Sequence, residues 1–185
     1  MGWPIRLARE ADAPILEELI RFSSRTLQAS YYSAAQIEAA LGPIFAVDHQ
    51  LIRDGTYFVV EPENTIVACG GWSKRKAFYG GGSARHAEES VLDQRFDAAR
   101  IRAFFVHPTR ARQGIGRAIL GACEQAIQAA QFLRADLVAT LAGEPLYAAS
   151  GYAVEERYEI PLADGLMLPV VRMSKIFQKG APALN

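Results

Sequence analysis

The sequence predicts a single domain of the mixed α/β class. Its 185 residues, half of them hydrophobic, fall in the range in which one core forms without disulfides or metals. Segments of β-rich composition are interspersed with segments whose apolar residues recur at helical spacing. No repeat with a period of 20 to 50 residues is visible. We therefore expect one domain over residues 1–178, with an irregular insertion at about 75–98 and a flexible tail at 179–185.

The N-terminal segment predicts a short strand followed by two helices. Residues 5–8 alternate as a strand, and Asp12 is a suitable N-cap for a helix that ends near residues 26–30. Ser33 then caps a shorter helical segment at 37–41, which a Gly-Pro pair ends.

A hairpin and a long irregular stretch follow the two helices. Residues 57–61 and 65–73 are rich in β-forming residues and are separated by Pro62, Glu63 and Asn64, which predicts two antiparallel strands. The pattern fails from residue 74 to residue 97, where three consecutive glycines precede a polar run. A loop of this length is typically either functional or mobile.

The second half of the chain predicts four strands and two helices. Residues 101–106 form an apolar strand, residues 107–113 a polar turn, and residues 115–130 repeat with helical period. The remaining predicted elements are a strand at 137–139, a short helix at 144–149 and two strands at 154–160 and 167–175. Strand, loop and long helix are therefore the central unit of the chain.

Composition excludes several classes of protein. Lysine plus arginine (20) equals aspartate plus glutamate (20), so no excess positive charge favours a nucleic-acid partner. The only cysteines, Cys69 and Cys123, cannot form a disulfide framework or a four-ligand zinc site, and we expect both to be buried thiols, with no metal bound. The N-terminus lacks an apolar signal region and no run of 18 apolar residues occurs, so we expect a cytoplasmic protein without a membrane partner.

The turn before the long helix is the strongest indication of a ligand. Gly114 and Gly116 lie where free backbone N–H groups and the helix dipole can bind a phosphate, and Arg110, Arg112 and Arg117 flank them. A dinucleotide fingerprint needs a third glycine at residue 119, which is isoleucine, and no GxxxxGK[ST] motif occurs. Taken alone, the turn is also compatible with an ordinary, closely packed strand-to-helix connection.

Two segments in the order of a known family extend this interpretation. The segment HPTRARQGIGRAIL resembles motif A of the GNAT N-acetyltransferases, and ATLAGEPLYAASGY resembles motif B. The opening IRLAREADAPILEEL is similar to the family's first strand and helix, so the resemblance covers about residues 5–176. It implies a single N-acetyltransferase domain whose mixed, mostly antiparallel sheet of about six or seven strands is flanked by about four helices. It also implies acetyl transfer from acetyl-coenzyme A to a primary amine by direct attack through a tetrahedral intermediate.

The resemblance assigns cofactor contacts residue by residue. The implied contacts to coenzyme A are Phe105, Val106, Arg110, Arg112, Gln113, Gly114, Ile115, Gly116, Arg117, Thr140 and Tyr147. The turn would grip the pyrophosphate, and the backbone of Phe105 and Val106 would contact the pantetheine and the thioester oxygen. Ala111 replaces the usual Gln or Arg, so either Arg110 or Arg112 would take over that contact. Thr140 stands where Asn is commonest.

Tyr147 is the candidate proton donor to the departing thiolate, because it aligns with the motif B tyrosine. Its other interpretation is a core aromatic residue that packs a short helix on the sheet. Four side chains are candidates for the proton acceptor, three in the irregular insertion and one in the turn before the long helix. They are His86, Glu88, Glu89 and His107.

The amine acceptor is not readable from the sequence. Either a small-molecule or a peptide amine fits the resemblance, and fold cannot choose between them. The side chains expected to line its site are Tyr31, Tyr32, Trp72, Phe78, Tyr79 and those near Asp164. Two rival functions remain open, a non-catalytic acyl-coenzyme A sensing domain and a nucleotide or phosphosugar binding domain. The sequence does not indicate the oligomeric state, and the resemblance is compatible with a homodimer.

Overall fold

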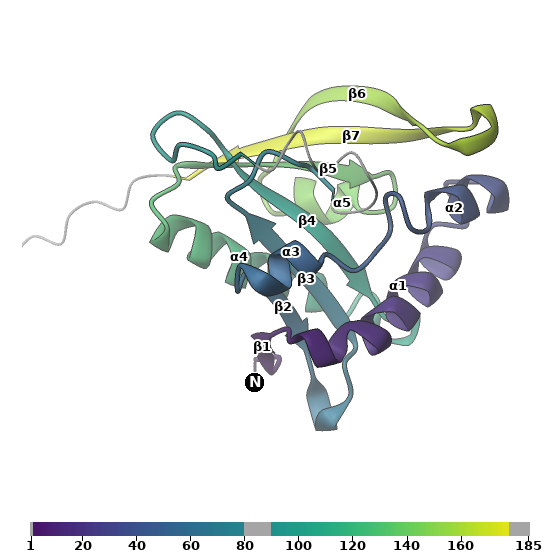
Figure 1. Cartoon of the computed structure of the whole chain (residues 1–185), viewed down its shortest axis with the longest axis horizontal. Coiled ribbons are helices and arrows are strands. Elements are labelled where there is room, and N and C mark those ends of the chain that lie inside the picture. Colours follow the sequence, from purple (N-terminus) through teal and green to yellow (C-terminus); the bar gives the residue numbers. More distant parts are fainter. Residues whose placement is uncertain (1, 80–89, 178–185) are drawn as a thin grey trace, which may run out of the picture.

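Seven strands form one mixed sheet in the computed structural model, which describes residues 2–79 and 90–177 (Figure 1). The strands are β1 (Ile5–Leu7), β2 (Tyr57–Val60), β3 (Ala68–Ser73), β4 (Ala99–Val106), β5 (Arg134–Thr140), β6 (Ala153–Pro161) and β7 (Met167–Ile176). Their order across the sheet is β1-β2-β3-β4-β5-β7-β6. Neighbouring strands are antiparallel except β4 and β5, which are parallel. The expected mixed, mostly antiparallel α/β fold is confirmed.

Helices cover both faces of the sheet. They are α1 (Ala13–Leu27), α2 (Ala34–Ala40), α3 (His49–Arg53), α4 (Ile115–Ala129) and α5 (Glu144–Ala148). Apolar residues of α4 and α5 pack in a core on one face, and those of α1, α2 and α3 pack in a second core on the other. Short 3-10 turns at Glu10–Asp12, Pro62–Asn64, Pro108–Arg110 and Ala163–Gly165 connect the elements. The sheet therefore separates two distinct sides.

The described part of the chain has five α-helices, one more than expected. The additional helix, α3, is only five residues long, so it carries too little periodicity to be read from the sequence. Its signal is the cap: the Asp48 carboxylate accepts hydrogen bonds from the N–H groups of Gln50 (3.1 Å) and Leu51 (3.2 Å). At α2 the predicted Ser33 cap is present, with reciprocal bonds between Ser33 and Gln36 (2.8 and 3.2 Å).

The two parallel strands separate along their length. Strand β4 pairs with β5 only from Ala99 to Ile101, although it continues on β3 as far as Val106. Strand β5 meanwhile stays paired with β7 up to Thr140. Beyond Ile101 the facing edges of β4 and β5 therefore carry no ladder bonds to each other, and a gap opens in the sheet.

A β-bulge in β4 lies where the two strands separate. The register of β3 against β4 shifts between Cys69 and Gly71, and Ala103 has a left-handed backbone with φ of +61°. Gly70 makes room for the bulged strand, because a Cβ there would lie 2.7 Å from the Phe104 ring. Nothing in the local sequence indicates the bulge, since alanine rarely adopts positive φ.

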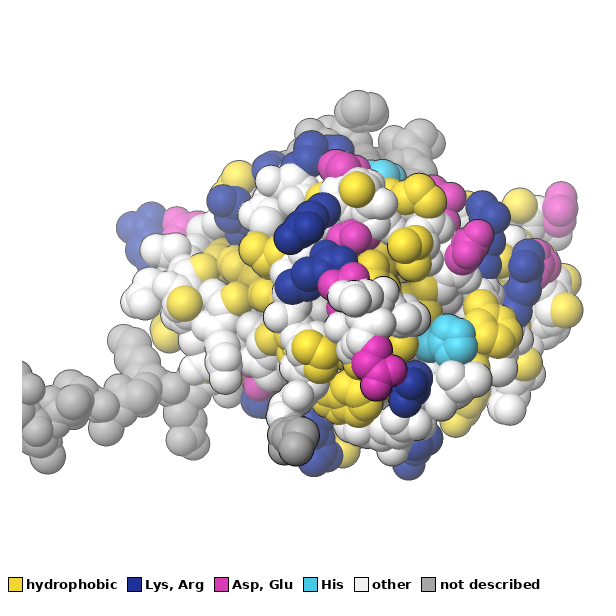
Figure 2. Space-filling model, turned by 90° about the horizontal axis from the view of Figure 1, so that it is seen from below, with side chains coloured by type: hydrophobic (Ala, Val, Ile, Leu, Met, Phe, Trp, Pro, Cys, Tyr) yellow, Lys and Arg dark blue, Asp and Glu magenta, His cyan; other side chains and the backbone are white. Residues whose placement is uncertain are grey.

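The edges of the fold show how distant segments meet. Figure 1 shows the long β6–β7 hairpin reaching over α2, where the Gln36 side chain donates to the Met167 carbonyl (2.7 Å). Basic and acidic side chains are interspersed on the face seen from below, consistent with the balanced composition (Figure 2). No helix in the described part of the chain is long and apolar enough to cross a bilayer.

Two expected segments lie partly or wholly outside the described residues. Residues 80–89, in the middle of the irregular insertion, are not described, and neither is the tail from 178 onward. The described flanks of the insertion meet at an isolated bridge between Arg75 and Val91, and Arg75 pairs with Asp54 (2.8 Å). Cys69 and Cys123 are both buried free thiols, as expected.

Candidate active site

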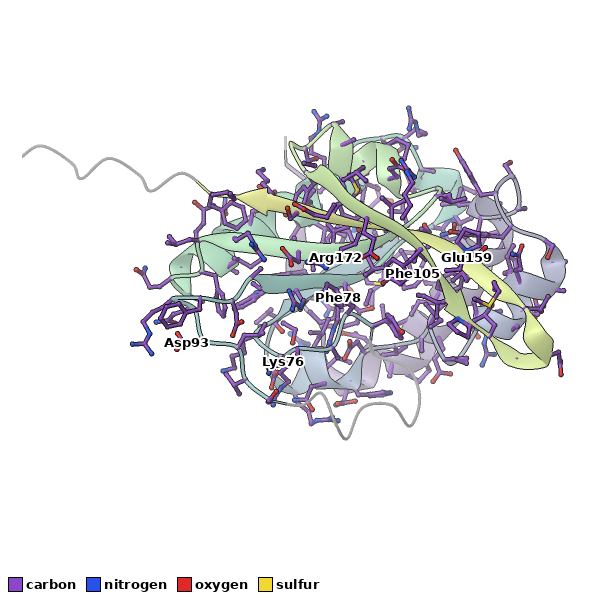
Figure 3. The ribbon with its side chains drawn as sticks, turned by 90° about the horizontal axis from the view of Figure 1, so that it is seen from above. Lys76, Phe78, Asp93, Phe105, Glu159 and Arg172 are labelled. Atoms are coloured by element: carbon purple, nitrogen blue, oxygen red, sulfur yellow. The ribbon has the colours of Figure 1, made fainter. Side chains whose placement is uncertain are left out.

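A cavity of about 500 Å³ occupies the gap between β4 and β5 and opens to both faces of the sheet. On the face covered by α4 it is lined by the turn from Arg110 to Arg117. On the face covered by α1 it is lined by a largely apolar group, Ile44, Phe45, Phe78, Tyr79, Ile160, Leu168 and Val170, which we call the apolar wall. Phe78 and Phe105 point toward the middle of the molecule, whereas Asp93 lies at its periphery (Figure 3).

The turn before α4 presents a series of free backbone donors. In the described chain, the N–H groups from Arg112 to Arg117 donate to no carbonyl, and the first bond of the helix runs from Ala118 N to Gly114 O (3.0 Å). Arg112 (φ +64°) and Gly114 (φ +82°) both adopt left-handed backbone, which turns these donors toward one concave side. Such a nest at a helix N-terminus binds phosphate oxygens.

The two glycines of the turn are required for different reasons. Gly114 is the N-cap of α4 in a left-handed conformation that favours glycine. Gly116 has ordinary φ, but a Cβ there would lie 3.0 Å from Leu146 Cδ2, at the start of α5. The first glycine therefore shapes the turn, and the second lets motif B approach it closely.

Three arginines surround this turn with uncompensated charge. Arg110, Arg112 and Arg117 are exposed, and none pairs with a carboxylate within residues 2–79 and 90–177. All three line the cavity, as does Ala111 between the first two. Both Arg110 and Arg112 therefore reach the cavity on either side of residue 111, where the motif usually has a longer side chain. The Gln113 amide is used locally, donating to the Thr109 carbonyl (3.3 Å).

The free edge of β4 forms the middle of the cavity. Phe105 and Val106 lie beyond the last β4–β5 pair, and both line the cavity. The Phe105 ring turns away to pack against Phe45, with centroids 6.1 Å apart, so the backbone is what this residue offers to a ligand. Ile115 is likewise buried in the core, and only its main chain faces the turn.

Tyr147 and Thr140 lie together across the gap from β4. The Tyr147 ring makes edge contacts with Phe104 and Tyr152, at centroid distances of 6.0 and 5.9 Å. Among the described residues its hydroxyl has no hydrogen-bond partner, and the side chain lines the cavity. Burial raises the pKa of Tyr147, so this hydroxyl keeps its proton throughout the physiological range. Both interpretations of Tyr147 thus apply, since it is a packed aromatic with a free polar end.

The candidate proton acceptors are not assembled at the cavity. His107 does not line it; the ring bonds to Thr109 Oγ1 (2.8 Å) and packs edge-on against Phe22 (5.1 Å). His86, Glu88 and Glu89 lie outside the described residues. Across the described lining, no carboxylate or imidazole is present.

The aromatic residues expected at the acceptor site divide into two groups. Phe78 and Tyr79 line the cavity as expected. Tyr31, Tyr32, Trp72 and Asp164 do not; Tyr32 and Trp72 are buried elsewhere, and Trp72 packs against Phe132. Sequence reasoning also missed cavity residues that only the fold brings in. They include Ser23, Gln28, Ile44, Phe45, Arg102, Leu168 and Val170.

Comparison with known families identifies the fold. The family profile described as Acetyltransferase (GNAT) domain matches residues 53–154, more than half of the chain. The chain belongs to the GNAT acetyltransferase family. It is therefore an acetyltransferase whose acyl donor is acetyl-coenzyme A. No curated protein matches the sequence significantly.

Solved structures agree with the fold of a GNAT acetyltransferase. A GCN5-related N-acetyltransferase (aminotransferase, class-II) from Rhodopseudomonas palustris matches with a TM-score of 0.73 and 19% identity over 96% of this chain and 97% of that one. PaiA N-acetyltransferase from Thermoplasma acidophilum, in complex with coenzyme A, gives 0.67 and 17% over 96% and 100%. A GNAT family acetyltransferase from Brucella melitensis, in complex with acetyl-CoA, gives 0.56 and 14% over 98% and 92%.

The residues present suit the donor of a GNAT enzyme. A row of free backbone donors, with three arginines that pair with no described carboxylate, fits a pyrophosphate, and the unpaired β4 edge fits the amides of a pantetheine arm. Within the described chain, no three His, Cys, Asp or Glu side chains are grouped so that they could hold a metal ion.

Proposed function

We propose that this protein transfers the acetyl group of acetyl-coenzyme A to a primary amine by direct attack through a tetrahedral intermediate. The observation that carries the proposal is the cavity itself. It connects the anion-binding turn on one face with the apolar wall on the other, and Tyr147 lies at the gap between them. A donor and an acceptor can thus enter from opposite faces and meet at the parted strands.

The donor would be held mainly by the main chain. The N–H groups of residues 112–117, with Arg110, Arg112 and Arg117, would bind the pyrophosphate. The pantetheine amides would pair with the free edge of β4 at Phe105 and Val106, with Thr140 facing them from β5. This places the thioester in the gap, next to Tyr147.

The reaction needs a hydrogen-bond donor at the departing sulfur. The amine nitrogen bonds to the thioester carbon, the C–S bond of the resulting intermediate breaks, and the nitrogen loses a proton as the sulfur gains one. Reference pKa values of about 10 for a phenol and 8.5 for a thiol put full transfer from tyrosine to thiolate about 2 kcal/mol uphill. Burial raises the pKa of Tyr147 further, which favours a donated hydrogen bond during C–S cleavage. The proton that the sulfur gains is the one that the nitrogen loses.

The proposal also covers the extent of the domain, its compartment, its acceptor class and its oligomeric state. Residues 1–178 form one N-acetyltransferase domain that works in the cytoplasm on a small-molecule or peptide amine. A homodimer is compatible with this arrangement. The acceptor enters over the apolar wall.

A thiol-release screen tests the proposal. The full chain is titrated with acetyl-coenzyme A by calorimetry, then assayed for thiol release with small amines, amino acid amides and short peptides. We expect binding that coenzyme A competes with and simple nucleotides do not, and thiol release with at least one amine. Absence of binding up to millimolar concentrations would remove the proposal. Binding without release across the panel would favour the non-catalytic acyl-coenzyme A sensor.

A further inference from the structure

One buried polar group at the cavity lacks a partner. Gln28, directly after α1, extends its side chain to Thr140, with 3.2 Å between Gln28 Nε2 and Thr140 Oγ1. Its other amide atom, Oε1, is buried and accepts no hydrogen bond in the described structure. Gln28 also lines the cavity. A buried acceptor of this kind is satisfied when a ligand supplies an N–H donor.

The fold holds Gln28 firmly in this position. The Tyr32 hydroxyl accepts a hydrogen bond from Leu141 N (2.9 Å) and donates one to the Pro169 carbonyl (2.6 Å). The Gln28 carbonyl in turn accepts bonds from the N–H groups of Tyr31 and Tyr32 (2.9 and 3.0 Å). These bonds fasten the end of α1 to β5 and β7, so the side chain does not need to be ordered by the ligand.

Gln28 lies beside the reacting centre. A Cβ placed on Gly143 would be 3.3 Å from Thr140 Oγ1 and 3.5 Å from Tyr147 Cε2, so both side chains lie against this glycine. Thr140 Oγ1, which anchors the Gln28 amide, also accepts a bond from Gly143 N (3.2 Å). The Gln28 amide is therefore anchored on a side chain that shares the Gly143 contact with Tyr147.

The rest of the acceptor end is unfavourable for a charged amine. The apolar wall surrounds it, and the described lining contains no carboxylate or imidazole. Its one charged side chain on this face is Arg102, which pairs with Asp48 (2.7 Å) and donates to the Ala77 carbonyl (2.7 Å). Desolvation by the apolar wall disfavours an ammonium ion, and Arg102, already paired with Asp48, offers it no counter-charge. The described lining therefore favours an amine that arrives uncharged.

We propose that Gln28 Oε1 accepts a hydrogen bond from the attacking nitrogen, and that the acceptor is a weakly basic α-amine carrying an apolar side chain. The inference rests on the proposed function and adds its substrate class. At pH 7.5 roughly a third of an α-amine with a pKa near 7.8 is neutral, against about 0.1% of a lysine-type amine. The α-amine is thus ready to attack without a base among the described lining residues.

An amine panel tests the substrate class. Leucinamide and phenylalaninamide present an apolar α-amine, Nα-acetyl-lysinamide presents only a side-chain amine, and spermidine is a polycation. At pH 7.5 we expect kcat/KM for the α-amines to exceed that for the lysine side chain by roughly 10²-fold, as the neutral fractions imply. Equal or better use of spermidine or Nα-acetyl-lysinamide would overturn the class.

Two substitutions test the residue. Gln28→Met keeps the length of the side chain but removes the acceptor oxygen, and we expect KM for the amine to rise by about 10-fold with coenzyme A affinity unchanged, the loss of one hydrogen bond. Gln28→Glu restores an acceptor and supplies a negative charge, and should recover the amine KM and shift preference toward more basic amines. Gln128→Met, the same change on the exposed face of α4, is the control and should leave both constants unchanged.

The outcomes separate this inference from the proposed function. If Gln28→Met weakens coenzyme A binding and leaves the amine KM unchanged, Oε1 serves the pantetheine amides, and the inference is wrong while the enzyme stands. If the wild type releases thiol with basic amines alone, the substrate class is wrong and the function again stands. Only the loss of both coenzyme binding and thiol release would remove the two together.

Discussion

The two ends of the cavity are built in different ways. At the phosphate end, six consecutive residues, 112–117, supply main-chain donors, and the side chains that matter are three flexible arginines. At the acceptor end, the lining comes from the end of α1, the loop before α3, residues 78–79 and strands β6 and β7. A contiguous turn can be recognised from spacing, whereas a wall collected from five segments cannot. The proposed donor site can therefore be recognised in the sequence, whereas the acceptor site cannot.

The ends also differ in charge and in the source of their stability. The phosphate end carries exposed arginines without carboxylate partners in the described structure, which suits a polyanion that leaves and returns. The acceptor end is apolar and is held in shape by buried polar contacts, including Arg102 with Asp48. Disturbing the first should change binding of the donor alone. Disturbing the second should change stability or acceptor choice.

The largest effect is expected at the anchor of the acceptor end. Arg102→Met breaks an ion pair whose side chains are 4% and 0% exposed and leaves the buried Asp48 carboxylate without its guanidinium counter-charge. Such losses cost about 3 to 5 kcal/mol, so the midpoint of urea unfolding should fall markedly. Arg95→Met, which removes an exposed pair with Asp93, is the control and should change stability by less than about 1 kcal/mol. Equal midpoints for the two variants would contradict the anchoring role.

Tyr147→Phe should produce the next largest effect, because it acts where the two ends meet. Removing the hydroxyl should lower kcat by about 10²-fold, because the departing sulfur loses its hydrogen-bond donor, while calorimetric affinity for coenzyme A stays unchanged. Burial raises the pKa of Tyr147, so its hydroxyl stays protonated as the pH rises, and wild-type kcat should not fall on the alkaline side up to about pH 9. An unchanged kcat would remove Tyr147 from the chemistry.

A smaller effect is expected from crowding the phosphate end. Gly116→Val places a Cβ 3.0 Å from Leu146 Cδ2 and adds two methyl groups beyond it, so either Leu146 or the turn must move. We expect the KM for acetyl-coenzyme A to rise by about 10-fold, the loss of one charged hydrogen bond, with the amine KM unaffected. Gly121→Ala, later in the same helix and with open space at its Cβ, should keep both constants and stabilise the helix.

Ionic strength should have a smaller effect, and it should change the KM of the donor more than that of the amine. Raising potassium chloride should increase the KM for acetyl-coenzyme A several-fold, because exposed arginines are screened, and should leave the amine KM nearly constant. Comparing Arg110→Gln with Arg112→Gln shows which arginine binds the pyrophosphate in place of the motif's usual side chain at residue 111, since that variant should have the flatter salt dependence. An amine KM that follows salt as steeply as the donor KM would contradict the uncharged acceptor end.

The smallest expected signal is the reactivity of the two thiols. Cys69 and Cys123 are fully buried, and burial raises the pKa of Cys69 to about 12 and that of Cys123 as well. Native protein should therefore react with no equivalent of a disulfide reagent at about pH 8, and denatured protein with two. Rapid labelling of the native chain would show that the core around these residues opens, and would add background to a thiol-release assay.

The order and type of most elements were predictable because they follow from local pattern. The Ser33 cap, the period of α4 and the hairpin turn at 62–64 are properties of neighbouring residues. Helix α3 was missed because five residues hold little more than one turn of periodicity. The bulge at Ala103 was missed because the glycine that accommodates it, Gly70, lies on another strand.

By itself the sequence predicted the proposed donor end, because Gly114, Gly116 and their arginines lie within eight residues, and the phosphate binding that we propose there depends on the main chain of that one segment. It also named Tyr147, but only through resemblance to a motif. The tertiary structure decided where β4 and β5 separate and which wall faces the gap. It alone brought Gln28 to Thr140, 112 positions away in the chain. Contacts between residues so distant depend on the packing of the whole core, and no local pattern encodes them.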